Sequence, residues 1–121
     1  MAFEKIEEVN ERHLHILWAS GDPVTAEHMV LMYATNSLLL KWWDEVTVIV
    51  WGAAQLVVKE NASVRESMEK AKEAGVKFTG CLSCAMNLGT EDAMKEAGVE
   101  TIYWGGKLAE LQQNGKHVLS V

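Results

Sequence analysis

The 121-residue sequence has little proline, little cysteine and no excess of basic residues. One proline and 49% hydrophobic content exclude a collagen-like or disordered chain. The formal net charge of −6 argues against nucleic-acid binding, because phosphate backbones attract surfaces rich in Lys and Arg, and we expect no nucleic-acid partner. Two cysteines are too few for a disulfide framework, and in a reducing compartment they favour redox, sulfur or metal chemistry.

Several targeting and binding motifs are also missing. Neither G-x-G-x-x-G nor G-x-x-x-x-G-K-[ST] occurs, so the sequence gives no support for dinucleotide or nucleoside-triphosphate binding, and we expect no cofactor. Residues Met1–Glu8 are acidic and mixed, unlike a signal peptide. The apolar stretch Met29–Trp43 is too short and too often polar to span a bilayer of roughly 30 Å. We therefore expect a cytoplasmic protein without membrane contact.

What the sequence does contain is an alternation of strand and helix patterns. Strands are expected at 13–19, 45–51, 76–79, 100–104 and 117–121, and helices at 24–43, 53–59, 63–75, from 81 onward and 107–113. Alternating elements of this kind indicate a largely parallel sheet between helical layers. The prediction is one α/β domain over 1–121, with a mainly parallel five-stranded sheet in a three-layer α/β/α, flavodoxin-like layout.

The expected helix at 24–43 is apolar on nearly every side. A helix of this composition has to be buried all round, and one sheet covers only one side of it. A second layer of the chain or another subunit is therefore needed, and homo-oligomer formation is the simpler explanation.

Two local patterns predict how the later helices begin and end. Ser63 and Glu66 have the spacing with which two side chains cap a helix start reciprocally. The sequence Lys-Glu-Ala-Gly-Val occurs twice, at 72–76 and 95–99, and each copy is expected to lead from a helix into a strand.

Candidate site residues follow the ends of the expected strands. In open parallel sheets, binding sites form outside the carboxyl ends of the strands. Four junctions lie at that edge, so we expect a site drawn from Ser20 and Gly21, Trp51 and Gly52, Gly80 and Cys81, and Trp104 and Gly105.

Cys81 is the strongest candidate for chemistry because it falls where the third strand passes into a helix. Free backbone N–H groups and the helix dipole stabilise a thiolate at this position, and the thiolate is the reactive form of cysteine. Cys84 lies three residues on, within reach of Cys81 on the same helical face. It is either a second reactive thiol or a small buried residue.

The residues around Cys81 carry a family resemblance. Cys81, Ala85 and Gly89 match a pattern that resembles the DsrE-like (DsrE/DsrF/TusD) sulfur-relay family. The wider layout, from residues 20–22 after the first strand to the closing segment 103–111, is similar as well. The resemblance implies an α/β protein that forms dimers, trimers or hexamers. It also implies that Cys81 carries sulfane sulfur as a persulfide between donor and acceptor proteins. Two features differ from the pattern: Cys84 is an additional thiol, and Asn87 and Leu88 replace common arginines.

The sequence leaves three functions open. The first is a sulfur carrier or sulfurtransferase-like protein in which Cys84 either resolves the persulfide or is a packing residue without a chemical role. The second is a redox protein that cycles a Cys81–Cys84 disulfide, and the third is a non-catalytic oligomeric module that binds partners. A metal site is not expected, because two cysteines fall short of the four ligands of a closed zinc site.

Aromatic residues and histidines complete the candidates. Trp18, Trp51 and Trp104 either form the wall of a shared pocket or fill the core and subunit interfaces, and the second interpretation is preferred. His15 is expected to be a hydrogen-bonded core histidine. His28, one turn into the long helix, is not expected to take part in the chemistry.

Overall fold

A single parallel sheet organises the chain. The computed structural model describes residues 11–121, so Met1–Glu8, where no signal peptide is expected, lie outside the described residues. The strand order is β4-β3-β2-β1-β5, and every neighbouring pair is parallel. The strands are β1 (His13–Trp18), β2 (Glu45–Val50), β3 (Lys77–Cys81), β4 (Glu100–Ile102) and β5 (His117–Ser120). The predicted five-stranded parallel sheet is confirmed.

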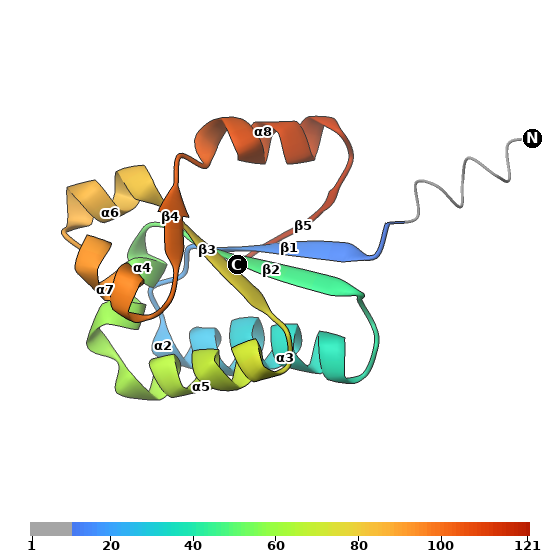
Figure 1. Cartoon of the computed structure of the whole chain (residues 1–121), viewed down its shortest axis with the longest axis horizontal. Coiled ribbons are helices and arrows are strands. Elements are labelled where there is room, and N and C mark those ends of the chain that lie inside the picture. Colours follow the sequence, from blue (N-terminus) through green and yellow to red (C-terminus); the bar gives the residue numbers. More distant parts are fainter. Residues whose placement is uncertain (1–10) are drawn as a thin grey trace, which may run out of the picture.

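Helices cover both faces of the sheet, which confirms the three-layer α/β/α prediction (Figure 1). The first three crossovers advance in one direction across the sheet, whereas the last returns to its other edge. Right-handed crossovers therefore place α8 on the opposite face from α2, α3 and α5. The helices are α2 (Pro23–Thr25), the π-helix η1 (Ala26–Leu31), α3 (Met32–Leu39), α4 (Ala53–Glu60), α5 (Ala62–Glu73), α6 (Leu82–Leu88), α7 (Glu91–Glu96) and α8 (Gly105–Gln113).

The hydrophobic core lies on the sheet face opposite α8. Side chains alternate along a strand, so β1 directs Leu14, Ile16 and Trp18 to this face, and the paired residues of β2 are Val46, Val48 and Val50. Burial of side chains of this size stabilises the fold by about 1.5–3 kcal/mol each. The other face carries the alternate residues, which include His13, His15, Thr79 and Cys81 and are more polar.

The helix expected at 24–43 is shorter than predicted. It forms α2, η1 and α3 in succession and ends at Leu39, after which Lys41 adopts a positive φ of 60° and turns the chain. Its outer side is exposed, and the exposed apolar side chains of this region are Val24, Met29, Met32, Leu39, Leu40 and Trp42. Among the described residues no second layer of the chain covers this outer side, so that alternative is wrong, and cover by another subunit stays a prediction. None of the helices within 11–121 combines the length and apolar content needed to cross a bilayer.

The predicted cap at Ser63 is also wrong. Helix α5 begins one residue earlier, at Ala62, with Asn61 as the preceding extended residue. The Ser63 hydroxyl instead donates a hydrogen bond to the Glu27 carboxylate over 2.7 Å and so links α5 to η1. By contrast, both Lys-Glu-Ala-Gly-Val repeats connect a helix to a strand as predicted, through Gly75 and Gly98, whose φ angles are 106° and 72°.

Candidate functional site

The two cysteines lie together at the predicted strand-to-helix turn. Cys81 is the last residue of β3 and the N-cap of α6. Its Sγ accepts a hydrogen bond from the backbone N–H of Cys84 over 3.3 Å. The Cys84 Sγ is 2.7 Å from the Cys81 Sγ, compared with the roughly 2.05 Å of a disulfide bond. Both thiols are free, and they are close enough to react with each other after a small movement.

Burial gives Cys81 a different electrostatic environment from the one expected. The residue is 5% exposed, whereas Cys84 is half-buried. Burial raises the pKa of the Cys81 thiol because it disfavours the thiolate, and the Cys84 thiol raises this pKa further. The N–H groups of Cys84 and Ser83 act in the opposite direction but do not reverse the shift. The expected exposed thiol of lowered pKa is therefore wrong for Cys81 in this structure.

A buried glutamine that the sequence analysis missed holds the cysteine turn. Gln55 is fully buried in α4, and its Nε2 donates to the carbonyl oxygens of Cys81 over 2.9 Å and of Val50 over 3.1 Å. The buried Thr90 hydroxyl donates to Gln55 Oε1 over 2.5 Å. The ends of β2 and β3 are thus tied to α4 and to the start of α7. In the sequence, the one indication of this role is a single amide side chain within the otherwise apolar segment 53–58.

Two glycines at the site cannot be replaced without strain. For Gly80 the reason is lack of space for a side chain, and for Gly52 it is the backbone conformation. A Cβ atom on Gly80 would lie 3.1 Å from a methyl group of Val99, so β3 and the segment before β4 approach closely here. Gly52 has φ 58° and ψ −129°, a combination that is open essentially to glycine alone. This backbone lets the chain turn sharply from β2 into α4, where Gln55 lies.

The other predicted strand-end residues differ in how directly they connect to the cysteine turn. Trp104 follows β4, which is next to β3, and its Nε1 donates to the Thr79 hydroxyl over 2.9 Å. Trp51 and Gly52 follow β2 and connect to Cys81 through Gln55. Ser20 and Gly21 follow β1, two strands from β3, and Gly21 packs against Ala53 instead. Gly105 is exposed at the first turn of α8.

The tryptophans do not form one wall. Trp18 is fully buried in the core, whereas Trp104 contacts the opposite face of the sheet, so the shared-pocket interpretation is wrong for these two residues. Trp51, which lies between these two residues in the sequence, is half-buried. His28 is exposed on η1.

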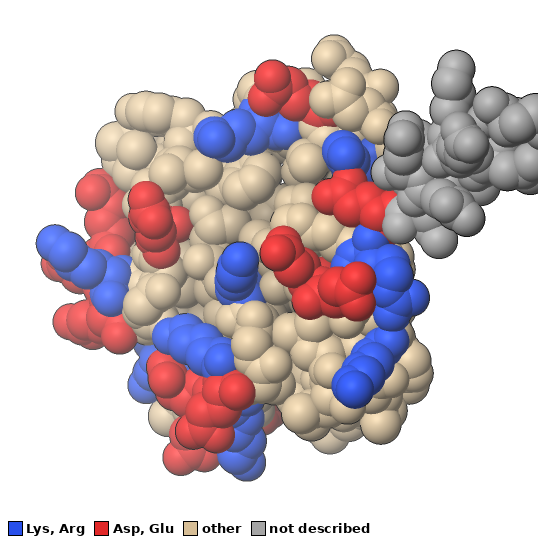
Figure 2. Space-filling view, turned by 45° about the vertical axis from the view of Figure 1, so that its right-hand side comes forward, with Lys and Arg blue, Asp and Glu red and all other residues tan. Residues whose placement is uncertain are grey.

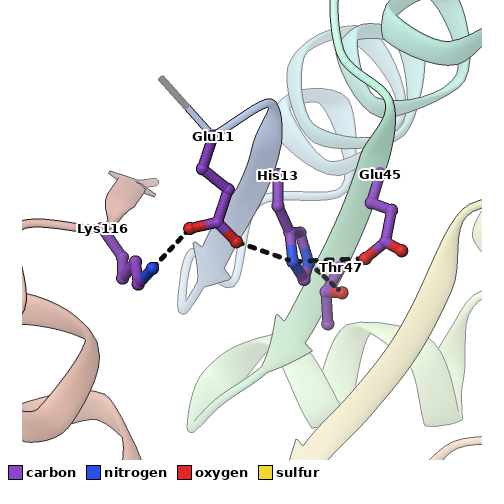
Figure 3. A network of polar contacts seen from close by, with 5 residues as sticks. All are labelled: Glu11, His13, Glu45, Thr47 and Lys116. Carbon is purple, nitrogen blue, oxygen red and sulfur yellow. Dashed lines mark hydrogen bonds and ion pairs between the residues drawn. The ribbon is translucent and has the colours of Figure 1, made fainter. Parts of the chain in front are cut away.

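A second polar cluster occupies the sheet face on the α8 side (Figure 3). His13 Nδ1 is 3.2 Å from Glu45 and 3.9 Å from Glu11, and its Nε2 is 2.9 Å from the Thr47 hydroxyl. Lys116 pairs with Glu11 over 2.5 Å and lowers the pKa of that carboxyl group. Figure 2 shows acidic and basic side chains intermixed over this view of the molecule, with uncharged surface between them. These cross-strand pairs connect the amino ends of β1 and β2 to the loop before β5.

His15 is buried as predicted, but the expected hydrogen bond at Nδ1 is absent among the described residues. The imidazole stacks on His13 with ring centroids 4.0 Å apart. Burial lowers the pKa of His15 to about 4, and the neighbouring His13 contributes in the same direction. The folded chain therefore favours the neutral imidazole.

Acidification is expected to destabilise the fold through His15. Because the pKa is about 4 in the folded chain and about 6.5 when unfolded, the contribution of His15 is complete above pH 6.5 and is lost as the pH falls towards 4. Between pH 7 and 4.5, the free energy of unfolding should fall by about 2 kcal/mol less in His15→Leu than in the wild type. Urea denaturation at the two pH values measures this difference. His28→Leu is the matched control, since His28 is exposed. An unchanged pH dependence in His15→Leu contradicts the assignment.

Ligand-binding geometry is limited in the described part of the chain. Within residues 11–121, no three His, Cys, Asp or Glu side chains are grouped so that they could hold a metal ion. A hollow of about 310 Å³ runs along α8 and borders Trp104 at one end and Lys116 at the other. It lies beside the polar cluster, and the cysteine pair is not among its lining residues.

Comparison with known proteins places the chain in a family. A scan of protein-family models gives no match, and a search of curated proteins gives none. The solved structure of a conserved protein, BT1422 from Bacteroides thetaiotaomicron, has a TM-score of 0.86 and 30% sequence identity, over 91% of this chain and 95% of that one. This chain belongs to the BT1422 family. BT1422 is described as a protein of unknown function, so membership of the BT1422 family assigns no activity.

A second solved structure shares the fold alone. MTH1491 from Methanobacterium thermoautotrophicum, also described as a protein of unknown function, has a TM-score of 0.64 and 18% identity. The match covers 93% of this chain and 100% of that chain. The fold of the BT1422 family therefore occurs in a sequence that differs at most positions, and the resemblance to the DsrE-like family stays a prediction.

Proposed function

We propose that this protein is a DsrE-like sulfur carrier that holds sulfane sulfur as a persulfide on Cys81 and passes it to an acceptor protein. The observation that carries the proposal is the pair of groups at the Cys81 Sγ: the N–H of Cys84 at 3.3 Å and the Cys84 thiol at 2.7 Å. The N–H of Cys84 stabilises negative charge on a sulfur held there, and the Cys84 thiol is close enough to exchange sulfur with Cys81. The proposed location is the cytoplasm, where thiols stay reduced.

The burial of Cys81 suits a holding role. A persulfide is reversible, and any free thiol that reaches it removes the outer sulfur. Because Cys81 is 5% exposed, a sulfur atom attached to it is shielded from solution thiols until an acceptor opens the turn. The raised pKa limits direct attack by Cys81 on donors, so the thiol does not react indiscriminately.

Sulfur retention tests the proposal. The protein is loaded with glutathione persulfide, challenged with reduced glutathione and analysed by intact-mass spectrometry with fragmentation. The wild type should keep a mass gain of roughly 32 Da, located at Cys81, whereas Cys81→Ser should keep none. Ser83→Ala, a change at an exposed neighbour, is the matched control and should behave as wild type. Absence of a retained adduct in the wild type contradicts the proposal.

A second candidate function is a dithiol redox protein, favoured by the 2.7 Å separation of the two sulfur atoms. Closure of the disulfide releases two protons and two electrons to an oxidant such as oxidised glutathione. Titration in glutathione buffers would then give a reduction potential of roughly −200 to −270 mV. A wild-type protein that forms this bridge and never gains sulfur would favour the redox function over the carrier.

We also propose that the protein is a homo-oligomer of two, three or six subunits. The exposed apolar side chains Leu39, Leu40 and Trp42 are 62%, 59% and 49% exposed, and a second copy would bury them. The same observation favours the third candidate, a non-catalytic module that binds partners. Sedimentation equilibrium tests the assembly, and a monomer at micromolar concentration contradicts it.

A further inference from the structure

The two thiols of the site are in contact but differ in their access to solvent. Cys81 is 5% exposed at the end of β3, whereas Cys84 is half-buried in the first turn of α6. A donor that approaches from solution therefore meets Cys84 first. Burial and the Cys84 thiol both raise the pKa of Cys81, so little of the Cys81 thiol is present as the nucleophilic thiolate at neutral pH.

We infer that Cys84 receives the sulfur and that Cys81 then takes it over, an inference that rests on the proposed function. In the first step, the Cys84 thiolate attacks the outer sulfur of a thiol persulfide, R–S–SH. The S–S bond of the donor breaks, and R–S⁻ leaves with the electron pair and takes up a proton. The product is a persulfide on Cys84, and no external oxidant or reductant is consumed.

In the second step, the sulfur moves between the two cysteines. The Cys81 thiolate attacks the outer sulfur of the Cys84 persulfide, a bond forms to Cys81, and Cys84 leaves as a thiolate. The two Sγ atoms are 2.7 Å apart, so the sulfur moves only a short distance. Small side-chain rotations separate the two Sγ atoms enough to admit it. The proton of Cys81 passes to the departing Cys84 sulfur, so charge and oxidation state balance. The sulfur thus moves from the accessible position to the shielded one.

The surroundings of Cys84 indicate the class of donor. No Lys, Arg, Asp or Glu occurs from Phe78 to Thr90, the segment that carries both thiols. An inorganic dianion such as thiosulfate would find no cationic side chain in this segment to hold it. Met86 and Asn87 are exposed on α6 and offer an uncharged surface instead. The donor class is therefore a thiol persulfide, either as a small molecule or on a partner protein.

Rapid-quench mass spectrometry with glutathione persulfide at pH 7 tests this order. Cys84→Ser should gain sulfur at least about tenfold more slowly than wild type, although it keeps Cys81. Cys81→Ser should gain sulfur at the wild-type rate, on Cys84, and lose it rapidly to reduced glutathione. Ser83→Ala should match the wild type in both measurements. Thiosulfate should load the wild type at least about tenfold more slowly than glutathione persulfide.

The outcomes separate this inference from the proposed function. Loading of Cys84→Ser at the wild-type rate would overturn the receiving role and leave a carrier that uses Cys81 alone. Loss of about 2 Da with release of hydrosulfide would show attack on the inner sulfur, which forms a disulfide and overturns the transfer step. Failure of every variant and of the wild type to gain sulfur would overturn the proposed function itself.

Discussion

Iodoacetamide is expected to alkylate Cys81 at least about tenfold more slowly than Cys84 at pH 7, each as the only thiol of the chain. The variants are Cys84→Ser, which leaves Cys81, and Cys81→Ser, which leaves Cys84. Cys81 is 5% exposed and burial raises its pKa, so little thiolate is present and the reagent reaches it poorly. Alkylation is followed by mass spectrometry from pH 6 to 10.

The pH dependence provides the internal check on this prediction. A thiol of raised pKa gains thiolate only at higher pH, so the alkylation rate at Cys81 should still be rising at the upper end of this pH range. In concentrated urea the two variants should react at equal rates, because unfolding removes the difference in burial. Equal rates in the folded protein would show that the access assigned to the two thiols is incorrect.

Gln55→Leu is expected to lower the free energy of unfolding by about 3 kcal/mol. Leucine fills a similar volume but removes the donor to the Cys81 and Val50 carbonyl groups and the acceptor for Thr90. Three buried polar groups then lack partners, and each carries a desolvation penalty of about 1–3 kcal/mol, part of which local relaxation recovers. Urea denaturation at pH 7 measures the change.

Gln112→Leu serves as the matched control, because Gln112 is exposed on α8. Its effect should stay within about 0.5 kcal/mol. Thr90→Val removes one partner of Gln55 and should cost less than Gln55→Leu, about 1–2 kcal/mol. A Gln55→Leu variant as stable as the wild type would show that the hydrogen bonds at the cysteine turn contribute little.

Several features of this protein were predictable because they depend on neighbours along the chain. Alternation of apolar residues and turn-forming glycines is local information, and it predicted the five strands to within a few residues. The position of Cys81 between a strand and a helix, with Cys84 one turn on, follows in the same way. Helix 24–43 was overextended because apolar Trp42 and Trp43 continue the pattern beyond the turn at Lys41.

Other features depend on contacts between segments that are distant in the sequence, so they can be seen only in the folded chain. The exposure of Cys81 depends on what packs over the turn, and the partners of Gln55 lie at β2, β3 and Thr90. The meeting of a thiol pair with a helix start could be predicted from local sequence, since helix geometry brings residues three apart onto one face. Which thiol faces solvent was decided by long-range packing, because burial is a property of the whole fold and shifts a pKa through solvation.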